Sequence, residues 1–87
     1  MDPIKLCLVI PCFNEESLLQ DTNTIIHELL DDFKLRDIIS ASSYLLYVDD
    51  GSKDSTWEII KNIVLRTDSV AGIKLSTNFG HQNALLA

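Results

Sequence analysis

Hydrophobic residues form three short continuous runs along the chain, at 4–10 (IKLCLVI), 44–48 (YLLYV) and 70–75 (VAGIKL). Apolar runs of this length, rich in β-branched and aromatic residues, predict strands. The first run carries a single Lys and is bounded by Pro3 and Pro11. Because near-continuous apolar strands are typical of sheets covered on both sides, we expect this strand to be buried on both faces.

Between the first two runs, apolar residues recur at the spacing of an amphipathic helix. Asn14, followed by Glu15 and Glu16, suits its start, because Asn caps free amides and acids favour the positive end of the helix dipole. We expect the helix to end between Lys34 and Asp37. Its expected apolar residues are Leu18, Leu19, Ile25, Ile26, Leu29, Leu30 and Phe33, with Gln20, Asp21, Glu28, Asp31 and Asp32 outside.

A second helix is predicted over 54–67. Ser55-x-x-Glu58 has the form of a capping box at its start, and Asp54 is an alternative cap. After the third strand, the sequence predicts a loop and then the beginning of a last helix over 81–87. The buried stripe expected in the second helix consists of Trp57, Ile60, Ile63 and Val64.

The order strand, helix, strand, helix, strand, helix predicts an open α/β fold, a parallel sheet with helices on its faces. No linker, repeat or low-complexity tract divides 1–87. Three parallel strands leave two sheet edges unpaired. We therefore expect 1–87 to be part of a larger domain. The unpaired edges also allow two copies of the chain to associate.

Polar residues gather at the ends of the predicted strands, at 11–16 (PCFNEE), 49–52 (DDGS) and 76–81 (STNFGH). In open parallel sheets, ligands bind outside the carboxyl ends of the strands. Carboxylates such as Asp49 and Asp50 can accept hydrogen bonds from a nucleobase or a ribose, or hold Mg²⁺ or Mn²⁺. The alternative is a local role, because Asp side chains also form turns and cap helices.

Composition narrows the function classes. The net charge of −6 and the scattered basic residues argue against nucleic-acid binding. No apolar stretch approaches the roughly 18 to 20 residues that span a bilayer, and the first residues do not form a secretory leader, so a cytoplasmic chain is expected. Cys7 and Cys12 lie about 16 Å apart in an extended segment, beyond disulfide distance. We expect reduced, buried or half-buried thiols and no zinc site.

Several nucleotide-binding and hydrolase signatures are missing from the sequence. The glycines at 51, 72 and 80 cannot form G-x-G-x-x-G or G-x-x-x-x-G-K-[ST], which disfavours dinucleotide-dependent oxidoreductases and P-loop enzymes. There is also no G-x-S-x-G nucleophile elbow. Of the two histidines, His27 is expected at the helix surface and His81 at the ligand edge.

Three motifs carry a family resemblance: LVIPCFNEE (8–16), YVDDGSKDST (47–56) and LSTNFGHQNALLA (75–87). In order and spacing they resemble the amino-terminal half of a family 2 glycosyltransferase. The last motif is most similar to polyprenyl-phosphate glycosyltransferases, the group of dolichol-phosphate-mannose synthase and bactoprenol glucosyltransferase. The resemblance covers essentially all of 1–87. It implies the nucleotide-sugar-binding part of a GT-A domain, which is a Rossmann-like fold, left incomplete.

The resemblance also implies roles for particular residues. Phe13 stands where many family members have Tyr, so an apolar wall is kept and a hydroxyl is lost. Asp50 would contact the base or ribose, with Val48 beside the base, while Asp49 would be structural. No catalytic residue and no metal ligand is implied within 1–87. The implied nucleotide site consists of Pro11, Phe13, Glu15, Val48 and Asp50.

For the complete protein, the resemblance implies sugar transfer from a UDP- or GDP-linked donor to a polyprenyl phosphate, with inversion at the anomeric carbon. The lipid phosphate would attack, at the cytoplasmic face of a membrane. The family also implies a divalent metal, Mg²⁺ or Mn²⁺, held by a D-x-D motif that would lie beyond Ala87 with the acceptor-side residues. We expect 1–87 alone to bind no metal firmly and to show no turnover.

Two alternatives from other classes stay open. A receiver-like regulatory domain binds Mg²⁺ with an acidic pair at a strand end, but that pair follows the first strand and an Asp ends the third. Here the first strand leads into Pro11 and the third into Ser76. The other alternative is a non-catalytic interaction module that buries its sheet edge by self-association. A compact monomer in solution would argue against the interaction module.

Overall fold

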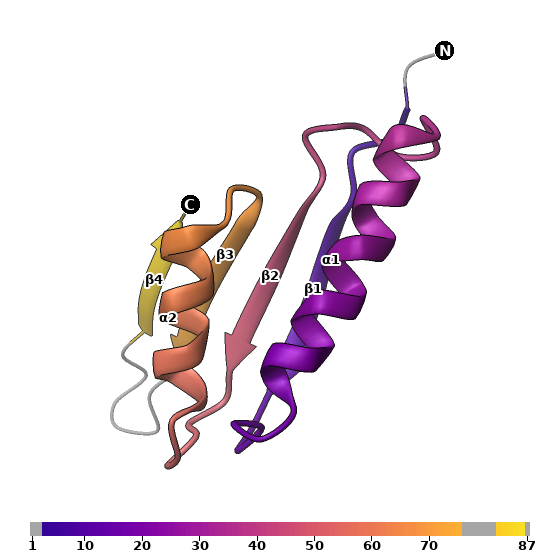
Figure 1. The fold of residues 1–87 in the computed structure, drawn as a ribbon. Coiled ribbons are helices and arrows are strands. Elements are labelled where there is room, and N and C mark those ends of the chain that lie inside the picture. The colour runs from indigo at the N-terminus through magenta and orange to yellow at the C-terminus, as the bar shows by residue number, and fades with distance from the viewer. Residues whose placement is uncertain (1–2, 76–81, 87) are drawn as a thin grey trace.

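The fold is a sheet with two helices, seen in a computed structural model that describes residues 3–75 and 82–86 (Figure 1). The sheet has the order β1-β2-β3-β4, in which the first three strands are parallel and β4 is antiparallel to β3. The predicted α/β class with an open parallel sheet is confirmed. The elements are β1 (Cys7–Cys12), α1 (Leu19–Leu35), β2 (Tyr44–Asp49), α2 (Thr56–Arg66), β3 (Val70–Leu75) and β4 (Gln82–Leu86).

Strand β4 occupies the segment in which the sequence predicted a last helix, over 81–87. That prediction is wrong for residues 82–86, which pair antiparallel along β3. Without β4, the outer edge of β3 would present unpaired N–H and C=O groups, and pairing with the following segment satisfies them. The predicted loop at 76–80 and His81 lie outside the described residues.

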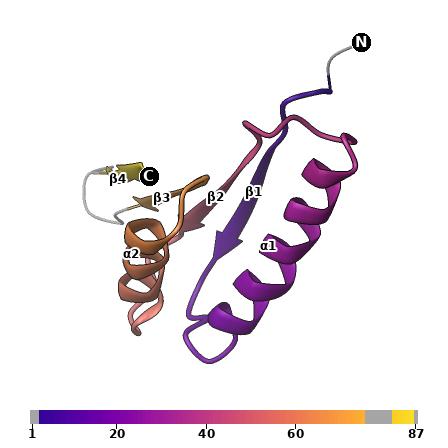
Figure 2. The same cartoon turned by 45° about the horizontal axis from the view of Figure 1, so that its top comes forward.

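Both helices pack on the same face of the sheet, as Figure 2 shows. Tyr47 of β2 and Gly72 of β3 are register partners, so they point to the same face. The Tyr47 hydroxyl donates a hydrogen bond to Asn23 Oδ1 of α1 at 2.6 Å, and Gly72 lies under Ile60 of α2. The sequence predicted helices on the faces of the sheet, and in the described chain both helices lie on one face. Both connections cross the sheet in the same direction, which places their helices on one side.

The core lies between this face and the helices, and α2 is the better buried of the two. Leu45 and Tyr47 of β2 are fully buried. A Cβ atom at Gly72 would lie 2.7 Å from Ile60 Cγ2, so glycine permits the close approach of α2 to β3. The predicted buried stripe of α2 is confirmed in full: Trp57, Ile60, Ile63 and Val64.

Strand β1 is an exposed edge strand, and the prediction that both its faces are buried is wrong. In the described chain β1 pairs with β2 alone, and Val9 is 53% exposed. The strand also continues through Pro11. The carbonyls of Leu6 and Cys12 accept hydrogen bonds from the β2 side, and backbone direction alternates along a strand. Pro11 therefore faces the free edge, where its missing N–H costs no ladder bond.

Helix α1 begins later and is less buried than the sequence predicted. Asn14 is not its cap, because Asn14 adopts a left-handed conformation with φ of 50° and the helix starts at Leu19. The helix ends within the predicted range. Leu19 and Leu30 are buried as expected, but Ile25 is 66% and Leu29 50% exposed. These two apolar residues have no covering element in the described chain.

Candidate functional site

The carboxyl ends of β1 and β2 lie side by side and lead into two loops, the 13–18 loop before α1 and the 50–55 loop before α2. Pro11 and Val48 are register partners. The N–H of Asp50 donates to the Cys12 carbonyl at 2.9 Å, which fastens the second loop to the end of β1. The two loops therefore leave the sheet at the same edge, as the sequence predicted.

The two acids at the end of β2 have different surroundings. Asp49 is fully buried, and its Oδ1 accepts the N–H of Ser52 at 3.2 Å together with the Ser52 hydroxyl. Its Oδ2 has no hydrogen-bond partner among the described residues. Asp50 is exposed, and within the described ranges its carboxylate makes no hydrogen bond. Asp49 thus has a local structural role, and Asp50 is the acid available to a ligand.

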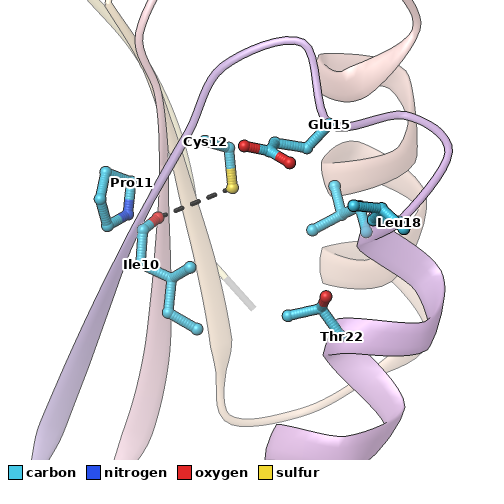
Figure 3. A pocket seen from close by; sticks show the side chains of 7 residues that line it. Ile10, Pro11, Cys12, Glu15, Leu18 and Thr22 are labelled. Carbon is cyan, nitrogen blue, oxygen red and sulfur yellow. Dashed lines mark hydrogen bonds between the residues drawn. The ribbon is translucent and has the colours of Figure 1, made fainter.

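Phe13 and Glu15 project from the 13–18 loop. Phe13 is 55% exposed, an unusual position for a large aromatic side chain. Glu15 is half-buried; its N–H donates to Thr56 Oγ1 at 2.8 Å, and its carbonyl accepts the N–H of Leu19 at the start of α1. The Glu15 carboxylate extends toward Cys12 (Figure 3). The loop backbone is therefore fixed at Glu15 from both sides.

A small cavity opens between the end of β1 and α1 (Figure 3). Its volume of about 190 Å³ is below the roughly 300 to 1,000 Å³ of common small-molecule pockets. Val48 and Cys12 lie on opposite faces of the sheet, because Val48 pairs with Pro11 and side chains alternate along β1. The five predicted residues therefore surround the strand ends and do not line one cavity. The cavity is lined by Ile10, Pro11, Cys12, Glu15, Leu18, Leu19 and Thr22.

The two cysteines are free and differ in exposure. Cys12 is buried, as expected, and Cys7 is exposed, which corrects the expectation of two buried or half-buried thiols. Cys7 lies on the uncovered β1 edge strand. Burial, with smaller contributions from the charges of Glu15 and Asp49, raises the pKa of Cys12 to about 11. The Cys12 thiol is therefore protonated at neutral pH and is a poor nucleophile.

Asp54 supplies the cap at the start of α2. Its Oδ1 accepts the N–H of Thr56 at 2.9 Å and the Thr56 hydroxyl at 2.5 Å, and its Oδ2 accepts the N–H of Glu16 at 3.3 Å. Desolvation works to raise the pKa of Asp54, but these hydrogen bonds outweigh it and hold the pKa below the ordinary value. The predicted capping box is wrong, because the Ser55 side chain makes no cap hydrogen bond. The alternative cap, Asp54, is confirmed.

Sequence reasoning missed Ser52 and Thr56, whose hydroxyl oxygens accept backbone N–H groups from the 13–18 loop. Their spacing from Asp49 and Asp54 fits turns in which a carboxylate accepts a nearby N–H. That spacing could have identified the local bonds. The partners in the other loop lie 38 and 41 residues away, and the sequence contains no signal for them.

The described residues do not fit the divalent metal that the resemblance implies. Across them, no group of three or more His, Cys, Asp or Glu side chains is arranged to hold a metal ion. The expected D-x-D motif was placed beyond Ala87. His27 lies on α1 near Asp31, with 3.6 Å between Nε2 and Oδ2, away from the ligand edge. In the same part of the chain, neither helix has the length and apolar character needed to cross a membrane.

Three known proteins that this chain resembles are all named as sugar transferases. The uncharacterized glycosyltransferase YkoT of Bacillus subtilis is 48% identical over 94% of this chain. The prophage bactoprenol glucosyl transferase homolog of Escherichia coli is 31% identical over 97%. The undecaprenyl-phosphate 4-deoxy-4-formamido-L-arabinose transferase of Shewanella sediminis is 35% identical over 92%. The chain spans 24%, 26% and 23% of the lengths of these three relatives, about a quarter in each case.

A family assignment rests on most of the chain. Residues 7–87 match the sequence model described as glycosyl transferase family 2. The matched range includes both loops at the ligand edge and both parallel strands that carry them. It also includes the three motifs on which the resemblance was based, so that resemblance is confirmed. The chain belongs to glycosyltransferase family 2.

Proposed function

We propose that the complete protein transfers a sugar from a nucleotide sugar to a polyprenyl phosphate, and that 1–87 supplies part of the donor's nucleotide site. Family membership supports sugar transfer in preference to a receiver-like domain or an interaction module. The acceptor class is supported by relatives whose names include bactoprenol and undecaprenyl phosphate. The proposed site residues are Pro11, Phe13, Glu15, Val48 and Asp50.

The observation that carries this proposal is the different environment of the two acids at the end of β2. The Asp49 carboxylate accepts hydrogen bonds from Ser52 within the protein. Asp50, in contrast, is exposed, and its N–H holds it beside β1 by donating to the Cys12 carbonyl. A free carboxylate accepts hydrogen bonds from a nucleobase imide or from ribose hydroxyls. Phe13 presents an exposed ring at the same edge, which can cover a flat base. Together these groups suit a nucleoside.

The proposed reaction needs no side-chain nucleophile from 1–87. A phosphate oxygen of the lipid forms a bond to the anomeric carbon while the bond from that carbon to the nucleoside diphosphate breaks, with inversion. The nucleoside diphosphate leaves with the bonding electron pair. The role of the described residues is to bind and orient the nucleoside, which places the anomeric carbon for in-line attack. No step is assigned to a metal here, because the described residues provide no ligand set for one.

The same proposal includes the donor nucleotide, which is UDP or GDP. It also places the reaction at the cytoplasmic face of the membrane. The proposed acceptor is itself a lipid phosphate, which would confine the reaction to a membrane surface. The acidic ligand edge repels the donor diphosphate, since Glu15, Asp49 and Asp50 all lie there. Lys53 is the one basic residue of the two loops, so we infer that most of the neutralising charge comes from other parts of the complete protein.

An assay of the complete protein tests the proposal. Membranes that contain it, undecaprenyl phosphate and labelled UDP- or GDP-sugars should yield lipid-linked sugar. Asp50→Asn keeps the size of the side chain and removes the charge, and it should lower kcat/KM for the donor roughly ten- to hundredfold. Asp68→Asn is the matched control. Asp68 is an exposed acid at the amino end of β3, away from the carboxyl ends that form the ligand edge, so this change should leave the rate unchanged.

Two results would contradict the proposal. Equal rates for Asp50→Asn and Asp68→Asn would remove Asp50 from the donor site. Transfer of the sugar to an acceptor that is not a lipid phosphate, with none to undecaprenyl phosphate, would overturn the acceptor class and leave the family assignment intact.

A further inference from the structure

Three successive backbone amides of the 13–18 loop are bound by side chains from the other loop and the start of α2. The N–H of Asn14 donates to Ser52 Oγ at 2.8 Å. The N–H of Glu15 donates to Thr56 Oγ1 at 2.8 Å, and the N–H of Glu16 donates to Asp54 Oδ2 at 3.3 Å. Glu15 is half-buried whereas Asn14 and Glu16 are exposed, so the Glu15 amide is the one that most needs a partner inside the protein.

Two hydrogen bonds run in the opposite direction. The N–H of Lys53 donates to Asn14 Oδ1, and the N–H of Ser55 donates to Glu16 Oε2, each at 2.9 Å. Five hydrogen bonds thus join the loops, and none of them is part of the sheet. We call this set the cross-loop clamp. It consists of residues 14–16 on one side and 52–56 on the other.

The clamp is anchored in the buried part of the protein at two points. Thr56 is fully buried, and because its hydroxyl donates to Asp54 Oδ1, a lone pair of Oγ1 is left for the N–H of Glu15. Ser52 is fixed in the same way, since its hydroxyl donates to buried Asp49 and its oxygen accepts the N–H of Asn14. Both hydroxyl groups are therefore held in one orientation, which suits them to set a distance.

The proposed ligand groups lie next to these anchors. Glu15 lies between two clamped residues, and Asp50 lies between Asp49 and Ser52. Among the described residues, neither the Glu15 nor the Asp50 carboxylate has a hydrogen-bond partner. Their relative position is thus set by the backbone that carries them, and the clamp fixes that backbone.

We propose that Thr56 and Ser52 are positioning residues, which hold the 13–18 loop against the 50–55 loop and so fix the spacing of Glu15 and Asp50 at the ligand edge. The effect on nucleotide binding rests on the function proposed above. The effect on loop order does not, because it follows from the hydrogen bonds alone. Both hydroxyls bond to backbone N–H groups of the 13–18 loop, so their proposed action is through the loop backbone.

Three variants of the 87-residue chain separate this role from general stability. Thr56→Val keeps the shape and removes the hydroxyl, and Thr56→Ser restores it. Thr24→Val is the matched control, since the Thr24 hydroxyl donates at 3.1 Å within exposed α1. Amide hydrogen exchange and ¹⁵N relaxation report the order of residues 14–16, and titration with UDP and with GDP reports affinity. Urea unfolding gives the folded fraction of each variant.

In Thr56→Val we expect the amides of residues 14–16 to exchange at least about tenfold faster and the better-bound nucleotide to bind about tenfold more weakly. Thr56→Ser and Thr24→Val should resemble the wild type in both measurements. If Thr56→Val does not fold, Ser52→Ala gives the same test at the Asn14 amide, because Ser52 is only partly buried.

Unchanged exchange and relaxation of residues 14–16 in folded Thr56→Val and Ser52→Ala would overturn the proposal. So would a loss of affinity that matches only the loss of folded protein. If the wild type binds neither nucleotide, the half-site fails, and exchange in residues 14–16 still decides whether the clamp orders the loop. Conversely, if the wild type binds a nucleotide but amide exchange in residues 14–16 does not change in the variants, the clamp fails and the half-site stands. The two failures are therefore distinguishable.

Discussion

The α2–β3 half and the α1–β1 half of the molecule have similar patterns of apolar residues in sequence, but they pack differently. Both helices carry an apolar stripe at helical spacing. In α2 all four predicted stripe residues are buried, whereas in α1 Ile25 and Leu29 are each at least half exposed. The difference shows that periodicity identifies the apolar side of a helix but does not reveal what covers it.

The cause lies in the position of each helix on the sheet. Helix α2 lies over β3 with strands on both sides of it, and Gly72 allows it to approach closely. Helix α1 lies beside β1 at the free edge of the sheet (Figure 1), so part of its apolar stripe extends past the last strand. The α2–β3 half should therefore carry most of the stability of the chain, and the following substitutions test that contrast.

The largest effect is expected from Ile60→Ala. Ile60 is fully buried between α2 and the sheet, so its truncation leaves a cavity. We expect the free energy of unfolding to fall by about 2 to 5 kcal/mol. Urea unfolding followed by circular dichroism measures it. A loss below about 1 kcal/mol would mean that the site collapses around alanine and that α2 is not the main packing element.

Gly72→Ala should have the next largest effect. The added Cβ would lie 2.7 Å from Ile60 Cγ2, so either the Ile60 side chain or α2 must shift, whereas its 3.5 Å distance to Trp57 Cζ3 is an ordinary contact. Overpacking of this kind costs about 1 to 3 kcal/mol. Ile60→Ala removes Cγ2, so the double variant Gly72→Ala with Ile60→Ala should lose less stability than the sum of the two single losses if this contact is the cause. Equal stability of Gly72→Ala and wild type would show that the two elements are loosely packed.

Tyr47→Phe tests the connection between the sheet and α1. Removal of the hydroxyl breaks its 2.6 Å hydrogen bond to Asn23 and should cost about 1 kcal/mol at neutral pH. Burial, aided by the nearby Cys12, raises the pKa of Tyr47 to about 12, from an ordinary value of 10.0.

The raised pKa of Tyr47 gives this variant a pH signature. Stability due to the neutral phenol is complete below pH 10 and is lost as the pH rises toward 12, because the unfolded chain ionises first. The advantage of wild type over Tyr47→Phe should therefore shrink across this range. Tyr44 is present in both proteins and cancels. An advantage that stays constant would show that Tyr47 is not buried as described.

The smallest effect is expected from Ile25→Ala. Ile25 is 66% exposed on α1, so its truncation should change stability by no more than about 0.5 kcal/mol. The same unfolding assay measures it, with Ile60→Ala as the matched change in the other half. A loss of more than about 1.5 kcal/mol would mean that Ile25 is covered in solution, for example by a second copy of the chain.

The sequence predicted the fold best where the chain covers its own apolar residues. Strands β2 and β3 and helix α2 were found with nearly correct bounds, because each carries a complete stripe or run. The exposure of β1 could not be predicted, since the sequence pattern of an apolar strand is the same whether or not a neighbouring strand pairs with it. Strand β4 was mistaken for a helix, because five residues are too few to separate the two periods.

The candidate site was predicted at the level of its position. Parallel strands place their carboxyl ends at one edge, which brought 11–16 and 49–52 together on general grounds. The burial of Asp49 agrees with the structural role that the resemblance implied, and the contact of Asp50 with a nucleotide stays a prediction. The cross-loop clamp could not be predicted, because its partners lie 38 to 41 residues apart and are paired by the tertiary fold alone.

The most direct test of the nucleotide half-site is an NMR titration of the 87-residue chain with UDP and GDP, with and without Mg²⁺, beside Asp50→Ala and Asp68→Ala. We predict shifts at Phe13, Glu15, Val48 and Asp50 that persist in Asp68→Ala and vanish in Asp50→Ala. The nucleotide that produces them identifies the base. Absence of shifts at millimolar nucleotide in a folded chain, or equal shifts in Asp50→Ala, would contradict a nucleotide site at this edge.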